Sequence, residues 1–143
     1  MGREVVECLR EYVDKLRRLG FPVASAVLFG SRARGDHLRH SDVDLLVILR
    51  RSSDPFLNRV AELARHWDEG YHLEVFPYTI DEVKALMNRG SVAIYDALDH
   101  GVVIVDDGTF EELRERFREA RSKGIVGRGA RGWWRVPSRA LVE

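Results

Sequence analysis

Apolar and polar positions divide the first third of the chain into a helix and two strands. Over residues 5–16 the apolar side chains recur at three-to-four spacing with charged residues opposite them, which is typical of an amphipathic helix that ends at Gly20. Two mostly apolar runs, 23–29 and 42–49, predict strands. A short loop separates these two runs.

Helical and extended patterns alternate in the middle of the chain. An apolar stripe predicts a helix from Phe56 to Trp67, with Ser53-Asp54-Pro55 as its cap and Gly70 at its end. A third strand is predicted over residues 71–78. Because a helix of about a dozen residues joins it to the second strand, the connection suits a crossover rather than a hairpin.

The spacing Thr-x-x-Glu occurs twice, at Thr79–Glu82 and Thr109–Glu112, and predicts two capping boxes that open helices. Ser91 begins a further helix, and residues 102–105 predict a short fourth strand. The last helix, 110–123, has a narrow apolar stripe and is expected on the surface. Together these elements predict an α/β (α+β) fold with about three to four strands flanked by helices.

Composition narrows the class of protein. The 143 residues are 45% apolar with a formal net charge of +0, so one globular domain is expected and bulk charge gives no attraction to nucleic acid or membranes. Cys8 is the single cysteine, which excludes a disulfide framework. Glu4 and Glu7 interrupt any signal-peptide core, and no apolar run reaches the roughly 18 residues of a membrane helix. A cytoplasmic location is therefore expected.

Candidate chemistry lies between the first two strands. The pair Gly30-Ser31 permits a sharp turn that presents N–H groups and a hydroxyl to an anion. Asp42 and Asp44 are two residues apart, so a strand places both carboxylates on one face, where they repel each other and favour a cation. Oxygen ligands of this kind suit Mg²⁺ or Mn²⁺.

A further acidic residue interrupts an apolar run. Glu74 is the charged residue within the run 73–76, about thirty positions after the aspartates. By its spacing, His72 shares a strand face with Glu74 and is near enough to contact the site, although an ordinary, partly exposed histidine is the simpler interpretation.

The order of these motifs resembles a known signature. Gly30-Ser31-x-Ala33-Arg34-Gly35 followed by Ser41-Asp42-x-Asp44-Leu45 is similar to the signature of the DNA polymerase β-type nucleotidyltransferases, in particular the minimal nucleotidyltransferases of prokaryotes. The resemblance implies a small mixed sheet and two Mg²⁺ ions held by Asp42, Asp44 and a third carboxylate from a neighbouring strand. Glu74 is the best match for the third carboxylate, whereas Asp68 or Asp81 would take this place in another register. It also implies that Gly30 and Ser31 bind a nucleoside triphosphate, with Arg34 or Arg32 neutralising its charge.

The same resemblance implies a function. Members of the family transfer a nucleoside monophosphate, here expected to be AMP from ATP, to an acceptor hydroxyl and release pyrophosphate. Minimal members often act on a tyrosine of a small helical partner of the HEPN type in a toxin–antitoxin pair. Two alternatives remain. The acceptor is an RNA end, or the chain is a non-catalytic antitoxin that only binds a partner.

The final residues differ in composition from the rest. We predict a nucleotidyltransferase domain over residues 1–123 and a basic tail over 124–143, which is rich in Gly and Arg and contains Trp133 and Trp134. Packing of the tryptophans back onto the domain is the favoured interpretation. The alternatives are a partner interface or nucleic-acid binding through phosphate contacts and base stacking. Whether the chain forms an oligomer stays open.

Overall fold

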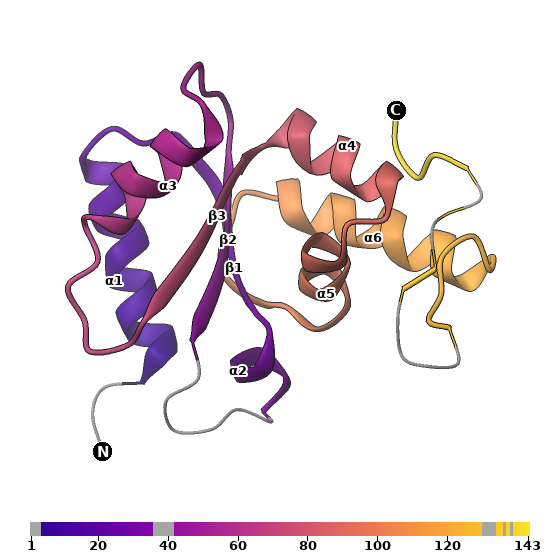
Figure 1. The fold of residues 1–143 in the computed structure, drawn as a ribbon, viewed down its shortest axis with the longest axis horizontal. Helices are drawn as coiled ribbons and strands as arrows, with labels where there is room; N and C mark the ends of the chain where they lie inside the picture. The colour runs from indigo at the N-terminus through magenta and orange to yellow at the C-terminus, as the bar shows by residue number, and fades with distance from the viewer. Residues whose placement is uncertain (1–3, 36–41, 130–133, 136, 138) are drawn as a thin grey trace.

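The computed structural model describes residues 4–35, 42–129, 134, 135, 137 and 139–143. Figure 1 shows the elements in chain order: α1 (Val5–Arg18), β1 (Val23–Phe29), α2 (Ser31–Arg34), β2 (Val43–Leu49), α3 (Phe56–Ala64), β3 (Leu73–Thr79), α4 (Ile80–Arg89), α5 (Val92–His100), β4 (Val102–Asp106) and α6 (Thr109–Ser122). No helix within these described ranges is long and apolar enough to cross a membrane.

The strands form one mixed sheet in the order β3-β2-β1-β4. β1 is antiparallel to both β2 and β4, whereas β2 and β3 are parallel. α3 provides the crossover that a parallel pair requires. The predicted fold class, a small mixed sheet flanked by helices, is confirmed.

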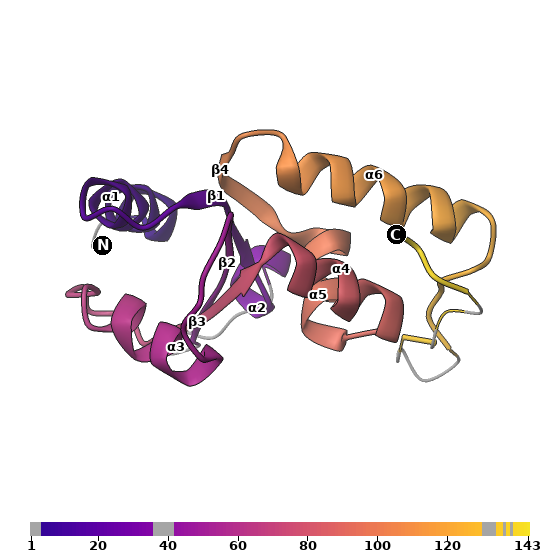
Figure 2. The same cartoon turned by 90° about the horizontal axis from the view of Figure 1, so that it is seen from above.

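Helices cover both faces of the sheet, with α1 and α3 on one face and α4, α5 and α6 on the other (Figure 2). The alternation of side chains along β2 explains this arrangement. Leu46 and Ile48 are buried against α4–α6, and Leu45 and Val47 are buried on the opposite face. Asp44 is two residues before Leu46 in β2, so its side chain points to the same face of the sheet as Leu46, the α4–α6 face.

The two predicted capping boxes have different outcomes. Thr79 and Glu82 form the predicted box at the start of α4. The prediction of a capping box at Thr109–Glu112 is wrong, because the N-cap of α6 is Gly108. Instead, the Asp106 carboxylate accepts hydrogen bonds from the N–H groups of Gly108 and Phe110 at 3.1 and 3.0 Å. The preceding aspartate therefore satisfies N–H groups at the start of α6, and the Glu112 N–H, which Thr109 was expected to satisfy, bonds to the Gly108 carbonyl at 3.0 Å.

α3 differs from its prediction at both ends. Pro55 is itself the N-cap rather than a residue of the first turn, and no side chain caps the helix there. The helix ends at Ala64, well before Gly70, because the N–H groups of His66 and Trp67 bond three residues back, at 3.2 and 3.1 Å. Such i to i−3 bonds tighten the chain into turns and end the helix.

Arg59 of α3 closes the outer edge of β3. Its side chain is only 8% exposed, and it donates to the carbonyls of Pro77 and Asp54 at 2.9 Å each. The His72 carbonyl accepts from the Val43 N–H at 2.8 Å, so even-numbered residues of β3 pair with β2 and Pro77 faces outward. Pro77 also lacks an N–H group. Neither backbone group of Pro77 is therefore available to an added strand.

Arg59 also forms a bidentate ion pair with Glu82, at 2.7 and 3.1 Å. Hydrogen bonds from Arg59 hold the pKa of Glu82 at about 2, below its ordinary 4.5, although partial burial opposes this shift. Because the folded-state pKa is the lower one, the stabilisation is complete above about pH 4.5 and is lost as the pH falls toward 2.

We expect Glu82→Gln to lower the free energy of unfolding at pH 7 by about 1–3 kcal/mol, because Arg59 loses its charged partner while Glu82 itself is partly solvated. Urea unfolding at pH 7 and pH 3 measures this, and the difference from the wild type should shrink at pH 3. Glu62→Gln is the control, since Glu62 is half exposed and lies 3.7 Å from Arg65. A difference that does not depend on pH would contradict the role of the ion pair.

The described part of the tail packs against α5 and α6. The Trp134 indole N–H donates to Asp96 at 2.9 Å, and its ring meets Tyr95 and Phe117 edge to face, with centroids 5.5 and 5.6 Å apart. The Arg128 guanidinium lies 4.2 Å from the centre of the same ring. The favoured interpretation is thus confirmed for Trp134, whereas Trp133 lies outside the described residues.

Candidate active site

The site begins at a turn that only glycine can make. β1 ends at Phe29, and Gly30 follows with φ +76° and ψ −159°, a conformation that L side chains rarely adopt. A Cβ atom at Gly30 would lie 2.2 Å from Oδ2 of Asp44. The turn and the Asp44 carboxylate are therefore in close contact, as expected from the pairing of Phe29 with Asp44 across β1 and β2.

The single turn of α2 carries the cationic candidates. The N–H groups of Ala33 and Arg34 both bond to the Gly30 carbonyl at 3.1 Å, which forms the turn. The Arg32 guanidinium lies over the Tyr71 ring, 4.9 Å from its centre. Arg34 is exposed, and its charge lowers the pKa of Asp44, so it is the arginine that acts on the carboxylates electrostatically.

Asp44 and Glu74 are brought together by the parallel pairing of β2 and β3. They are direct partners in the register, which makes their side chains neighbours. Burial raises the pKa of Asp44 from its ordinary 3.8 to about 6, helped by the neighbouring Glu74 carboxyl and by the charge of Asp42. Full ionisation of this group of carboxyls is thus unfavourable without a compensating positive charge.

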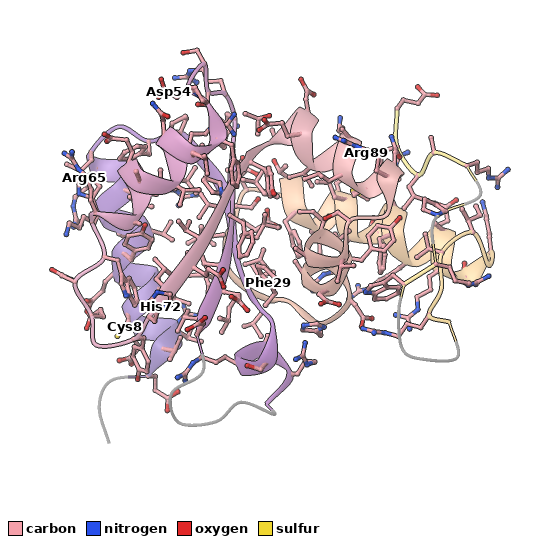
Figure 3. The ribbon with its side chains drawn as sticks, viewed as in Figure 1. Cys8, Phe29, Asp54, Arg65, His72 and Arg89 are labelled. Atoms are coloured by element: carbon pink, nitrogen blue, oxygen red, sulfur yellow. The ribbon has the colours of Figure 1, made fainter. Side chains whose placement is uncertain are left out.

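Asp42 lies just before β2 and its side chain is 50% exposed. Its Oδ1 atom is 3.0 Å from Nδ1 of His72. Figure 3 labels His72, and it also labels Phe29 at the end of β1. Nowhere in the ranges that the structure describes do three His, Cys, Asp or Glu side chains converge closely enough to hold a metal ion. The donor chemistry nevertheless fits a hard cation, because Asp44, whose pKa is raised, and the neighbouring carboxyl of Glu74 offer only oxygen.

The other carboxylates considered from the sequence lie elsewhere. Asp68 is 82% exposed and lies 3.9 Å from Lys15 of α1. Asp81 belongs to the first turn of α4, beyond the far end of β3. Glu74, rather than Asp68 or Asp81, is therefore the carboxyl that pairs with Asp44. Ser31 is the half-buried first residue of α2, beside Gly30.

Sequence reasoning did not assign the contacts of two residues just before β3. The Arg32 guanidinium lies over the ring of Tyr71, and the Asp42 carboxylate lies within hydrogen-bond distance of His72. For His72 the signal was its spacing of two from Glu74, whereas nothing in the pattern indicated the stacking of Arg32.

A pocket of about 510 Å³ lies at the opposite end of β2, around Leu49 and Arg51, and so does not include the carboxylates.

Comparison with solved structures identifies chains of the same fold. A candidate nucleotidyltransferase from Sulfolobus solfataricus is 20% identical, with a TM-score of 0.51 over 71% of this chain and 80% of the other. A toxin–antitoxin structure with AMP-PNP is 17% identical, with a TM-score of 0.52 over 81% and 88%. A MntA-HepT toxin–antitoxin structure is 13% identical, with a TM-score of 0.50 over 83% and 87%. At these identities the similarity shows the fold.

Sequence comparison gives the family. A candidate protein adenylyltransferase of Methanocaldococcus jannaschii, MJ1379, is 32% identical over 72 residues, which cover 50% of this chain and 71% of that protein. Residues 9–123 match the nucleotidyltransferase domain, which is most of the chain and includes Gly30, Asp42, Asp44 and Glu74. The chain therefore belongs to the nucleotidyltransferase domain family and is a nucleotidyltransferase.

Proposed function

We propose that this chain is a metal-dependent adenylyltransferase that moves AMP from ATP to a hydroxyl group of a partner protein. The observation that carries the proposal is the pairing of Asp44 with Glu74 across β2 and β3, beside the Gly30 turn. This pairing puts carboxylates for a cation next to a backbone turn suited to phosphate, which is the combination that a nucleoside triphosphate with Mg²⁺ requires.

Each residue has a stated role in the proposal. Asp42, Asp44 and Glu74 hold two Mg²⁺ ions, with Mn²⁺ as a substitute, and Gly30 and Ser31 bind the triphosphate. When bound, the metal ions neutralise phosphate charge and activate the acceptor oxygen. Arg34 offsets the charge that grows on the leaving pyrophosphate, while Arg32 is held on Tyr71 and contributes less.

The reaction is an in-line displacement at the α phosphorus of ATP. A bond forms from the acceptor oxygen to this phosphorus, and the bond from the phosphorus to the oxygen that bridges to the β phosphate breaks. Pyrophosphate leaves with that electron pair, and the hydroxyl proton passes to water. The protein contributes mainly by positioning the reactants and stabilising charge.

A small helical protein of the HEPN type, paired with this chain as toxin with antitoxin, is the proposed acceptor. The name of MJ1379 and the shared fold with the MntA-HepT structure support this choice. An RNA end is less well supported, because Arg128, Tyr95 and Phe117 already surround the ring of Trp134. A purely binding role does not account for the half-buried Asp44 carboxyl next to the carboxyl of Glu74.

Label transfer tests the proposal. Purified protein is incubated with Mg²⁺, native cell extract and ATP labelled at either the α or the γ phosphate. We expect covalent label on a protein band from α-labelled ATP alone, and its loss when EDTA removes the metal. Label on RNA would replace the protein acceptor with a nucleic acid, and label from neither form of ATP would contradict transferase activity.

A further inference from the structure

We propose that His72 is a positioning residue that orients the Asp42 carboxylate for cation binding. The inference rests on the proposed function and deepens it. His72 is assigned no contact with substrate or metal, and it acts through Asp42. The observations behind it are the 3.0 Å contact of the two side chains and the different ways in which Asp42 and Asp44 are held.

Asp44 is fixed by its surroundings, whereas Asp42 is not. Asp44 lies within β2, touches the Gly30 turn and is the register partner of Glu74. Asp42 precedes the strand, and half of its side chain is exposed. An exposed carboxylate that must adopt one rotamer to bind a cation loses conformational entropy in doing so. A neighbour that holds the rotamer beforehand reduces this loss.

His72 is itself well placed to hold the rotamer. Its backbone carbonyl accepts from the Val43 N–H at 2.8 Å, so the residue next to Asp42 fixes the main chain of His72. An ionised carboxylate can only accept, and therefore Nδ1 of His72 is the donor to Oδ1. This bond leaves the second oxygen of Asp42 available, on the strand face shared by His72 and Glu74.

Outer partners of this kind tune metal affinity without adding to stability. Removing a group that orients a metal-binding carboxylate typically costs about 10- to 100-fold in affinity. The His72 side chain is 74% exposed, so its removal deletes little buried contact. A positioning role thus predicts weaker metal binding at an unchanged melting temperature, a combination that a structural role would not produce.

The test measures Mn²⁺ binding to the full chain by electron paramagnetic resonance, together with melting of the metal-free protein. We expect His72→Leu to bind Mn²⁺ about 10- to 100-fold more weakly and to melt like the wild type. His72→Asn is the matched control, because its amide nitrogen can take the place of Nδ1 and should restore most of the affinity.

Each outcome has a distinct meaning. Wild-type affinity in His72→Leu would overturn this inference alone. Equal losses in His72→Leu and His72→Asn would also overturn it, because a donor to Asp42 would then not be what matters. If the wild type binds no Mn²⁺, the proposed metal-dependent function fails, and the role of His72 fails with it.

Discussion

Replacing Asp44 with asparagine should reduce the transfer of AMP from ATP by about a thousandfold, because metal-ion catalysis supplies several kcal/mol of charge stabilisation and each 1.4 kcal/mol is a factor of ten. The amide would keep the size of the side chain but provide one neutral oxygen in place of the charge that binds the cation. The measurement is the initial rate of label transfer from α-labelled ATP.

The same substitution separates function from folding. Burial and the neighbouring carboxyls raise the pKa of Asp44, so its negative charge is unfavourable in the metal-free site. Metal-free Asp44→Asn should therefore melt at the wild-type temperature or above. It should also lose the increase in melting temperature that Mg²⁺ with a non-hydrolysable ATP analogue gives the wild type by binding the folded state.

Asp68→Asn is the control for this prediction, because Asp68 is 82% exposed and was the alternative third ligand. It should keep both the transfer rate and the nucleotide-dependent increase in melting temperature. Normal transfer by Asp44→Asn, or a complete loss in Asp68→Asn, would place the reaction away from the β2 and β3 carboxylates.

Gly30→Ala should damage stability and activity together. The new methyl carbon would need to occupy a point 2.2 Å from Oδ2 of Asp44, and the backbone at φ +76° is strained for any L side chain. The strain alone costs about 1–3 kcal/mol. Moving Asp44 to relieve the contact would misplace the carboxylate, and displacements of about 1 Å can cost a hundredfold in rate. Urea unfolding and label transfer measure the two effects.

Gly20→Ala separates these two contributions. Gly20 also has a positive φ, +97°, but a Cβ atom there would meet nothing within 4 Å. We expect Gly20→Ala to lose some stability and to retain the wild-type transfer rate at a temperature where it remains folded. If both variants transfer AMP equally well, the contact between Gly30 and Asp44 has no catalytic importance.

Much of the fold followed from local patterns. β1 has the predicted bounds, and α4 has the predicted capping box. The failures occur at helix ends, where other groups bond to the backbone N–H groups. Asp106 displaces the predicted box at Thr109, and early turns end α3. The order of the strands in the sheet depends on tertiary pairing, which periodicity does not specify.

The site was predictable in part for a similar reason. Spacing alone placed Asp42 and Asp44 on one strand face, and an apolar run isolated Glu74. Only the register of β2 with β3 makes Glu74 the partner of Asp44. The catalytic roles of these residues stay predictions until the variants are measured.

The closed edge at Pro77 restricts how an acceptor can approach the site. β3 carries Glu74 near its start, and further along, at Pro77, Arg59 occupies the carbonyl and proline supplies no donor. An extended peptide therefore has no continuous ladder along the outer edge of β3. Recognition of the acceptor then falls to side chains, and a hydroxyl presented from a loop or a helix suits this geometry better than one on an added strand.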